Sequence, residues 1–169
     1  TYRVAWLLDH GTDPWNILLL TFTNKAAREM TERVRALIPI DLSRLWSGTF
    51  HSIANRILRQ HADYLGYTPA FTIMDSDDRK SMIKSIVKAL KLDEKSSRFP
   101  KPEVLSSLFS LADNEGAGIQ ETLENAYPYL SNHLDAILDV HEQYVLRKQE
   151  TNSMDFDDLL LNVVRLFQE

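Results

Sequence analysis

Residues 17–27, with the sequence ILLLTFTNKAA, decide the fold. Residues 17–22 are almost continuously apolar, which is typical of a parallel strand that is covered on both faces. Ala26, Ala27 and Met30 then begin a helical repeat. The stretch therefore predicts a buried strand that runs directly into a helix, with a polar, aromatic and basic turn between them. Open α/β sheets bind their ligands at such junctions.

A second junction of the same type lies at residues 46–52, with the sequence WSGTFHS. A strand, a helix and another strand form a βαβ unit, so we expect the two strands to be parallel. Their carboxyl ends then lie at the same edge of the sheet, about 4.8 Å apart. Two neighbouring junctions of this kind indicate a surface that holds an elongated ligand, such as a nucleic-acid strand.

The pattern changes to helices after Gly66, so we expect a mainly α protein with a small parallel β-sheet. An α/β piece should occupy residues 1–65, and an all-helical segment should occupy residues 66–169. Asn24 is the expected N-cap of the helix that follows the first junction. The helices are expected at residues 2–9, 24–38, 50–64, 76–90, 102–113, 120–127, 132–149 and from Asp155 onward, with a charged loop at 91–101.

Composition is that of an ordinary globular domain, with 44% hydrophobic and 25% charged residues. The absence of cysteine excludes disulfides and thiolate metal sites. No apolar run approaches the roughly 20 residues that span a bilayer, so we expect no membrane association. The net charge of −5 argues against nonspecific coating of nucleic acid, but it permits a local basic groove.

The first junction offers Phe22, Thr23, Asn24 and Lys25 to a ligand. Helix N-termini attract phosphate, and an exposed Phe can stack on a base. The alternative for Phe22 is a core position, which is the commoner fate of a phenylalanine at a strand end. From the pattern alone we predict an anion or nucleic-acid site.

The second junction offers Thr49, His51 and Ser52. Thr49 and Ser52 can simply cap the helix, and His51 can stack on a base, donate to phosphate or serve a structural role.

The acidic trio Asp155, Asp157 and Asp158 fits either a metal site or the start of a helix. We expect capping and first-turn charge to explain all three carboxylates, and predict no metal site. We also expect six aromatic side chains to lie in the core: Trp6, Trp15, Trp46, Tyr127, Tyr129 and Tyr144.

Together these segments resemble the UvrD/Rep/PcrA-type superfamily 1 DNA helicases. The resemblance is carried by residues 17–27, by Gly48-Thr49-Phe50-His51-Ser52, and by Met154-Asp155-Phe156-Asp157-Asp158-Leu159-Leu160. It extends over nearly the whole chain and is loosest at residues 93–133.

The resemblance implies an ATP-driven motor that moves 3′ to 5′ on single-stranded DNA and unwinds duplex DNA in repair or replication. It implies a partial RecA-like domain 1A of the P-loop NTPase type at residues 1–65, a helical 1B subdomain at 66–153 and a helix returning toward 1A at 154–169. The implied DNA contacts are Phe22, Thr23, Asn24, Thr49, His51 and Ser52. Arg33 matches a position that faces the nucleotide.

No G-x-x-x-x-G-K-[ST] phosphate loop occurs in the 169 residues, so we predict no catalytic residue here. We expect an excised piece of a larger bacterial, cytoplasmic and nucleoid-associated protein, which uses ATP and Mg²⁺. The piece alone should bind DNA at most, need no cofactor, and self-associate through its unpaired sheet edge. Two alternatives stay open: a nucleic-acid or protein interaction module without a motor, and the helicase part of a helicase–nuclease.

Overall fold

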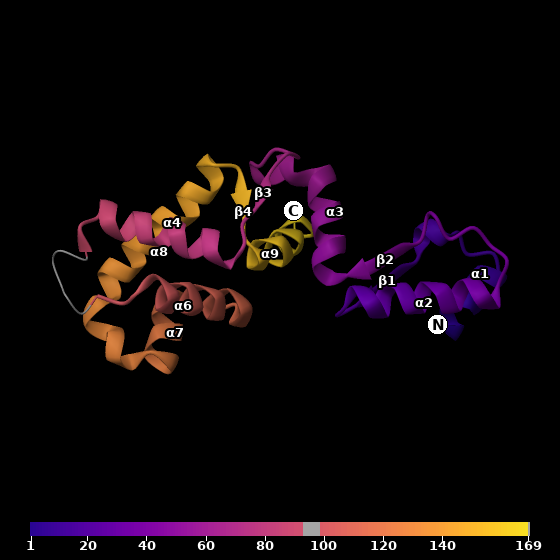
Figure 1. Cartoon of the computed structure of the whole chain (residues 1–169), viewed down its shortest axis with the longest axis horizontal. Coiled ribbons are helices and arrows are strands. Elements are labelled where there is room, and N and C mark those ends of the chain that lie inside the picture. The colour runs from indigo at the N-terminus through magenta and orange to yellow at the C-terminus, as the bar shows by residue number, and fades with distance from the viewer. Residues whose placement is uncertain (93–98, 169) are drawn as a thin grey trace. The chain divides into compact units, whose positions relative to one another are not determined.

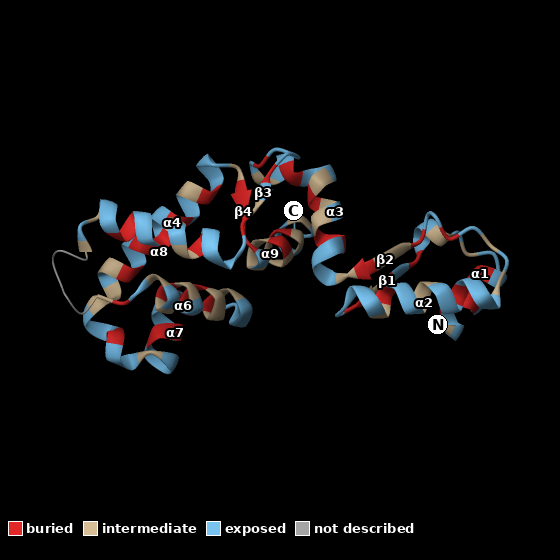
Figure 2. Ribbon diagram, in the orientation of Figure 1, coloured by how far each residue is buried: buried red, intermediate tan, exposed pale blue. Residues whose placement is uncertain are grey.

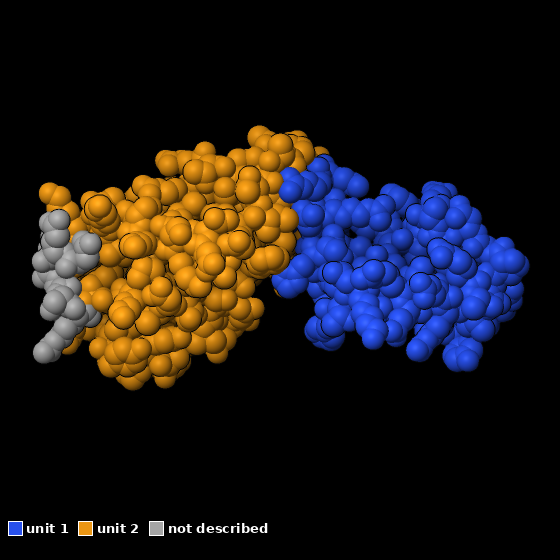
Figure 3. Space-filling view, viewed as in Figure 1, with its two compact units in different colours: residues 1–60 blue, residues 61–169 orange. Residues whose placement is uncertain are grey.

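The computed structural model describes residues 1–92 and 99–168 (Figure 1). The central part of the predicted loop at 91–101, residues 93–98, lies outside the described residues. The described chain forms two compact units, residues 1–60 and residues 61–169 (Figure 3). Helices dominate both units and the strands are short and parallel, so the predicted mainly α fold with a small parallel sheet is confirmed.

The first unit is built around a βαβ arrangement. Its elements are α1 (Tyr2–Asp9), a 3₁₀ turn (Pro14–Asn16), β1 (Leu18–Thr21), α2 (Asn24–Leu37), β2 (Trp46–Thr49) and α3 (Phe50–His61). β1 and β2 pair in parallel and in register from Leu18 opposite Trp46 to Thr21 opposite Thr49, which confirms the predicted strand direction.

An apolar cluster joins α1, β1, α2 and the loop that leads into β2. Alternate residues of β1 are buried, because successive side chains of a strand point to opposite faces. The buried members of the cluster are Val4, Leu8, Ile17, Leu19, Val34, Leu42 and Leu45. This packing fixes the strand ends, and with them the residues that follow each strand.

The second unit is helical. Its elements are a 3₁₀ turn (Ala62–Leu65), β3 (Thr72–Ile73), α4 (Ser76–Ala89), α6 (Pro102–Glu115), α7 (Ile119–Ala126), a 3₁₀ helix (Pro128–His133), α8 (Leu134–Glu150), β4 (Ser153–Met154) and α9 (Phe156–Leu166). Gly66 ends the first turn in a left-handed conformation (φ 78°), and Pro102 occupies the first position of α6, as expected.

The helices of the second unit bury one apolar face each, which Figure 2 shows as red positions among pale blue ones. The core of the unit includes Ile83, Leu105, Phe109, Leu123 and Ile137, all with 0% of their surface exposed. Burial of each such side chain contributes about 1.5–3 kcal/mol. The sequence did not predict the two-residue parallel pair of β3 and β4, which joins the start and the end of this unit.

Candidate nucleic-acid interface

The two strand–helix junctions meet at one edge of the first unit. Because Thr21 lies opposite Thr49 in the parallel pair, the residues that follow both strands lie side by side. We call this surface the carboxyl edge; it comprises Phe22, Thr23, Asn24, Thr49, Phe50, His51 and Ser52. The structure therefore brings all six residues predicted to contact DNA to one surface.

Helix α2 starts at this edge with a threonine cap. The Thr23 backbone is extended, and its Oγ1 accepts a hydrogen bond from the Ala26 backbone N–H at 3.1 Å. The Thr21 hydroxyl in turn donates to the Thr23 carbonyl oxygen at 2.9 Å. The expected N-cap, Asn24, is wrong by one residue, since Asn24 is already helical and its exposed side chain does not cap the helix.

Helix α3 starts at Phe50, the residue that directly follows β2. Thr49 Oγ1 accepts from the Ser52 backbone N–H at 3.2 Å, and the Ser52 hydroxyl donates to the Thr49 carbonyl at 2.9 Å. The capping alternative is thus confirmed for Thr49, whereas Ser52 supplies the capped N–H and its hydroxyl donates back to the Thr49 carbonyl. A Cβ at Gly48 would meet the Ser52 hydroxyl oxygen, so a larger residue there would force the Ser52 side chain out of its bond to the Thr49 carbonyl. These two hydrogen bonds fix the helix start, and the cap uses the Thr49 hydroxyl as an acceptor only, not its O–H proton.

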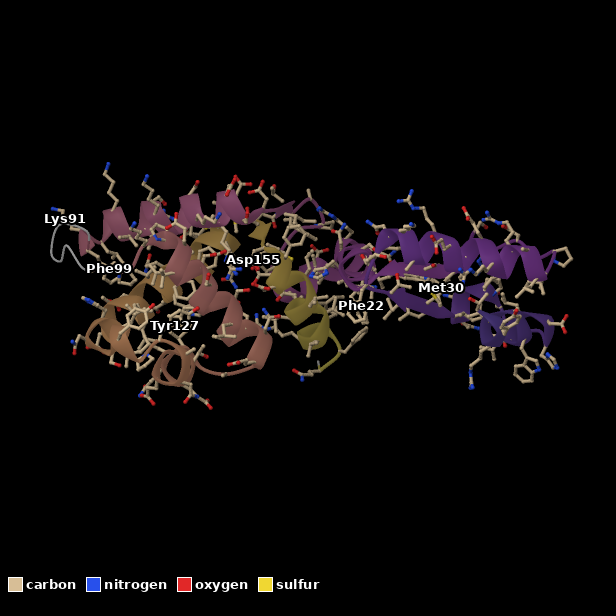
Figure 4. The ribbon with its side chains drawn as sticks, turned by 60° about the horizontal axis from the view of Figure 1, so that its bottom comes forward. Phe22, Met30, Lys91, Phe99, Tyr127 and Asp155 are labelled. Atoms are coloured by element: carbon tan, nitrogen blue, oxygen red, sulfur yellow. The ribbon has the colours of Figure 1, made fainter. Side chains whose placement is uncertain are left out.

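Two aromatic rings dominate the exposed part of the carboxyl edge. Phe22 is 90% exposed at the end of β1 (Figure 4), so the alternative of a core position is wrong. Phe50 is 41% exposed, and its ring centroid lies 5.5 Å from that of Phe22 with the rings tilted by 44°. The site prediction did not include Phe50; its place directly after the second strand was the available clue.

The polar groups around the two rings favour an anion. Asn24, Lys25 and His51 are exposed in the first turns of α2 and α3. A helix start presents backbone N–H groups that lack intrahelical acceptors, together with the positive end of the helix dipole. Lys25 adds a cation. Its ammonium lies 3.9 Å from the Glu29 carboxylate in an exposed ion pair, and a phosphate can take the place of that carboxylate. The edge can therefore hold a series of phosphates beside the two tilted rings.

Arg33 lies away from the carboxyl edge, on the outer face of α2. It lines a hollow of about 480 Å³ together with Thr1, Tyr2, Ala36 and Leu37. Its guanidinium is 4.0 Å from the Glu29 carboxylate, within an exposed ion pair. The structure thus separates Arg33 from the six residues predicted to contact DNA.

The acidic trio belongs to the start of α9. Asp155 is the N-cap and forms a reciprocal capping box with Asp158, so the capping explanation is confirmed for these two residues. Asp157, in the first turn, accepts from Arg79 Nη1 at 2.6 Å and from the Ser110 hydroxyl at 2.7 Å. Figure 4 places Asp155 among the side chains of the helical unit.

The carboxylates at α9 are balanced by buried cations. Lys148 Nζ lies 3.1 Å from Asp155 and 2.7 Å from Asp158, and the Tyr144 hydroxyl donates to Asp155 at 2.7 Å. Burial alone would raise the pKa of Asp155, but Lys148 and Arg79 hold it below the ordinary value. Burial and the nearby Asp155 raise the pKa of Asp158, against the opposing effect of Lys148.

Cation binding elsewhere finds little support. Within residues 1–92 and 99–168, no three His, Cys, Asp or Glu side chains gather in a way that could hold a metal ion.

In the same ranges no helix has the length and apolar character needed to cross a membrane.

The expectation that six aromatic residues form core was wrong for three of them. Tyr144 is buried and Tyr127 packs, partly buried, against the same core, but Tyr129 is 69% exposed, Trp6 58% and Trp15 47%. Trp46 is half-buried and stacks under the Arg56 guanidinium, 3.9 Å from the ring centroid. Cation–π contacts of this kind let a large ring remain partly exposed.

The chain is similar to known proteins over its whole length. The whole chain, residues 1–169, matches the family model described as UvrD/REP helicase N-terminal domain. The ATP-dependent DNA helicase PcrA of Staphylococcus aureus (strain Mu50 / ATCC 700699) is 38% identical over 169 residues, which cover 99% of this chain and 22% of the relative. PcrA of Staphylococcus epidermidis (strain ATCC 12228 / FDA PCI 1200) is 37% identical over the same shares. The chain thus spans about a fifth of the length of these curated relatives.

Proposed function

The chain belongs to the UvrD/REP helicase N-terminal domain family, and on this premise we propose that it is a DNA-binding part of an ATP-dependent DNA helicase. The observation that carries the proposal is the carboxyl edge, where two helix starts flank a phenylalanine that is 90% exposed. An exposed ring beside two helix N-termini suits a ligand that has both a flat base and phosphates, since the ring can stack on the base and the helix starts attract the phosphates.

The proposed ligand is single-stranded DNA. An unpaired base has a free π-face, and stacking on an aromatic ring contributes about 1–3 kcal/mol per base without regard to sequence. In a duplex each base is already stacked on its neighbours, so Phe22 should favour the single strand. Duplex DNA ahead of that strand is the expected substrate of the complete protein.

The backbone of the strand would run over the two helix starts. Phosphates are attracted to helix N-termini, where Asn24 and His51 can add side-chain donors. The Thr23 and Thr49 hydroxyl oxygens accept from N–H groups of the helix starts, so we propose that their O–H protons can donate to a phosphate. The Ser52 O–H already donates to the Thr49 carbonyl oxygen, so we propose that Ser52 acts by holding the helix start. None of these contacts reads a base edge, so binding should be independent of sequence.

The complete protein would supply the motor. We propose residues 1–65 as part of domain 1A, residues 66–153 as the 1B subdomain, and residues 154–169 as a helix returning toward 1A. Arg33 would face the nucleotide from the hollow that it lines. Hydrolysis in P-loop motors needs a loop lysine, a metal and usually an arginine from across the cleft. The 169 residues hold no phosphate loop, so no hydrolytic step is assigned to them and the chain alone should be inactive.

The wider role follows from the family and stays a proposal. We expect movement from 3′ to 5′ in DNA repair or replication, in the bacterial cytoplasm near the nucleoid. A nuclease elsewhere in the complete protein is a second possibility, and a passive binding module is a third. β1 and β2 form a two-stranded sheet in the described residues, so its outer edges are available for self-association.

Fluorescence anisotropy with a labelled oligothymidylate tests the proposal. Affinity should fall as salt rises, with a logarithmic slope of about −0.7 per phosphate contact, and a duplex of equal length should bind less tightly. Lys25→Ala should reduce the slope by about one contact, whereas Lys84→Ala, an exposed lysine of α4, should not. Absence of binding, or binding that is insensitive to salt, would refute the proposal. Measurable ATP turnover by the chain would refute its predicted inactivity.

A further inference from the structure

The Phe22 ring has very little to hold it in place. With 90% of its surface exposed, few neighbouring atoms restrict its rotation about χ1 and χ2. A freely rotating ring loses entropy when it stacks on a base, and this loss lowers affinity. The ring contacts Phe50, at a centroid distance of 5.5 Å and a tilt of 44°. This distance lies in the range at which aromatic pairs attract each other.

The backbone places Phe50 at this spot. Thr21 and Thr49 are register partners, so Phe22 and Phe50 are equivalent next residues of two adjacent parallel strands. Phe50 is also the first residue of α3, and the cap formed by Thr49 and Ser52 fixes its backbone. One ring of the pair is therefore anchored on a capped helix, and the other projects into solvent.

We propose that Phe50 is a positioning residue for single-strand binding, which holds the Phe22 ring in the orientation that stacks on an unpaired base. This inference rests on the proposed function and goes beyond it, because it assigns a role to a residue outside the predicted set. The two rings are tilted by 44° and Phe22 is 90% exposed, so the contact with Phe50 leaves ring surface on Phe22 for the base. Phe50 then acts through Phe22, and its effect should depend on Phe22.

A double-mutant cycle measures this dependence. The four proteins are the unchanged chain, Phe22→Ala, Phe50→Ala and the double variant, each titrated into labelled oligothymidylate. Loss of one base stack by Phe22→Ala should weaken binding by about 5- to 150-fold. Loss of the aromatic pair by Phe50→Ala should weaken it by about 2- to 12-fold. In the Phe22→Ala background, Phe50→Ala should have less than about a 2-fold effect.

A second readout separates positioning from folding. Oligonucleotides with 2-aminopurine lose fluorescence when the base stacks, so Phe50→Ala should reduce quenching at saturating protein. Phe50→Tyr keeps the ring and should restore quenching, whereas Phe50→Leu keeps bulk alone and should not. Trp6→Ala removes a 58% exposed ring from α1 and serves as the control without effect.

The outcomes are distinguishable. If Phe22→Ala leaves affinity unchanged, the stacking role in the proposed function fails. If Phe22→Ala weakens binding but Phe50→Ala has no effect, or has the same effect in both backgrounds, the positioning role of Phe50 fails alone. Rescue by Phe50→Leu would also overturn it, because bulk rather than an aromatic ring would then be sufficient.

Discussion

Replacement of Lys148 by methionine should destabilise the helical unit, and the size of the effect should depend on pH. Lys148 is 4% exposed and bridges Asp155, which is 2% exposed, and Asp158. Methionine has a similar length but carries no charge, so the change leaves the buried Asp155 and the partly buried Asp158 without their ammonium partner.

The magnitude follows from these contacts. Removal of one partner of a buried ion pair costs about 3–5 kcal/mol. Asp155 would retain the Tyr144 hydroxyl and the Arg79 guanidinium, whose Nε lies 3.9 Å away, so we expect the lower end, about 3 kcal/mol at pH 7. With a urea m-value of about 1–3 kcal/mol/M, the unfolding midpoint should fall by about 1–3 M.

The sign of the pH effect is fixed by the carboxylates. In the unchanged protein Lys148 helps hold the pKa of Asp155 below its ordinary value, which stabilises the fold above the unfolded pKa. Without Lys148 the pKa values of Asp155 and Asp158 in the folded protein rise. The free energy of unfolding of the variant is therefore lowered at pH 7, where both carboxyl groups must ionise. The penalty should shrink as pH falls toward about 4, where unfolded carboxylates also take up protons.

Urea unfolding followed by far-UV circular dichroism at pH 7 and pH 4 measures both effects. Lys80→Met is the matched control, because Lys80 pairs with the exposed Asp77 at 3.0 Å and its removal should leave stability unchanged. Equal midpoints for Lys148→Met and the unchanged chain at pH 7 would refute the reasoning. So would a penalty that is the same at both pH values.

Three further results are expected. Thr23→Ala should cost about 1 kcal/mol in thermal or urea unfolding because it removes the α2 cap, whereas Asn24→Ala should cost much less; equal losses would contradict the assigned cap. Gly48→Ala should lower both stability and oligothymidylate affinity, since its Cβ meets the Ser52 hydroxyl, and an unaffected variant would count against that packing. Burial raises the pKa of Asp113 to about 6, so ionisation of Asp113 opposes folding as pH rises from about 4 to 7. Urea unfolding should therefore show that Asp113→Asn stabilises the chain at pH 7 but not at pH 4.

Local patterns were sufficient for the strand–helix junctions. The apolar run at residues 17–22 and the short segment at residues 45–49 predicted two parallel strands. The structure pairs these strands in register. The βαβ rule then placed both junctions at one edge. The cap of α2 was misplaced because Thr23 and Asn24 are both good N-cap residues, and the backbone conformation decides between them.

Long-range contacts were beyond such patterns. The pairing of β3 with β4 joins two-residue strands at residues 72–73 and 153–154, and neither strand is long enough to show a period of two. The partners of the acidic trio, Arg79 and Lys148, come from α4 and α8. One clue was available, because Lys148 continues the buried stripe of α8 formed by Ile137, Val140 and Tyr144.

The central claim is that single-stranded DNA lies over the carboxyl edge, and photocrosslinking tests it most directly. An oligothymidylate with 4-thiothymidine at defined positions would be irradiated in complex with the chain, and the attached peptides identified by mass spectrometry. Crosslinks are expected within residues 20–25 and 49–53, and excess unlabelled oligothymidylate should abolish them. Crosslinks confined to residues 61–168, with none at either strand–helix junction, would contradict it.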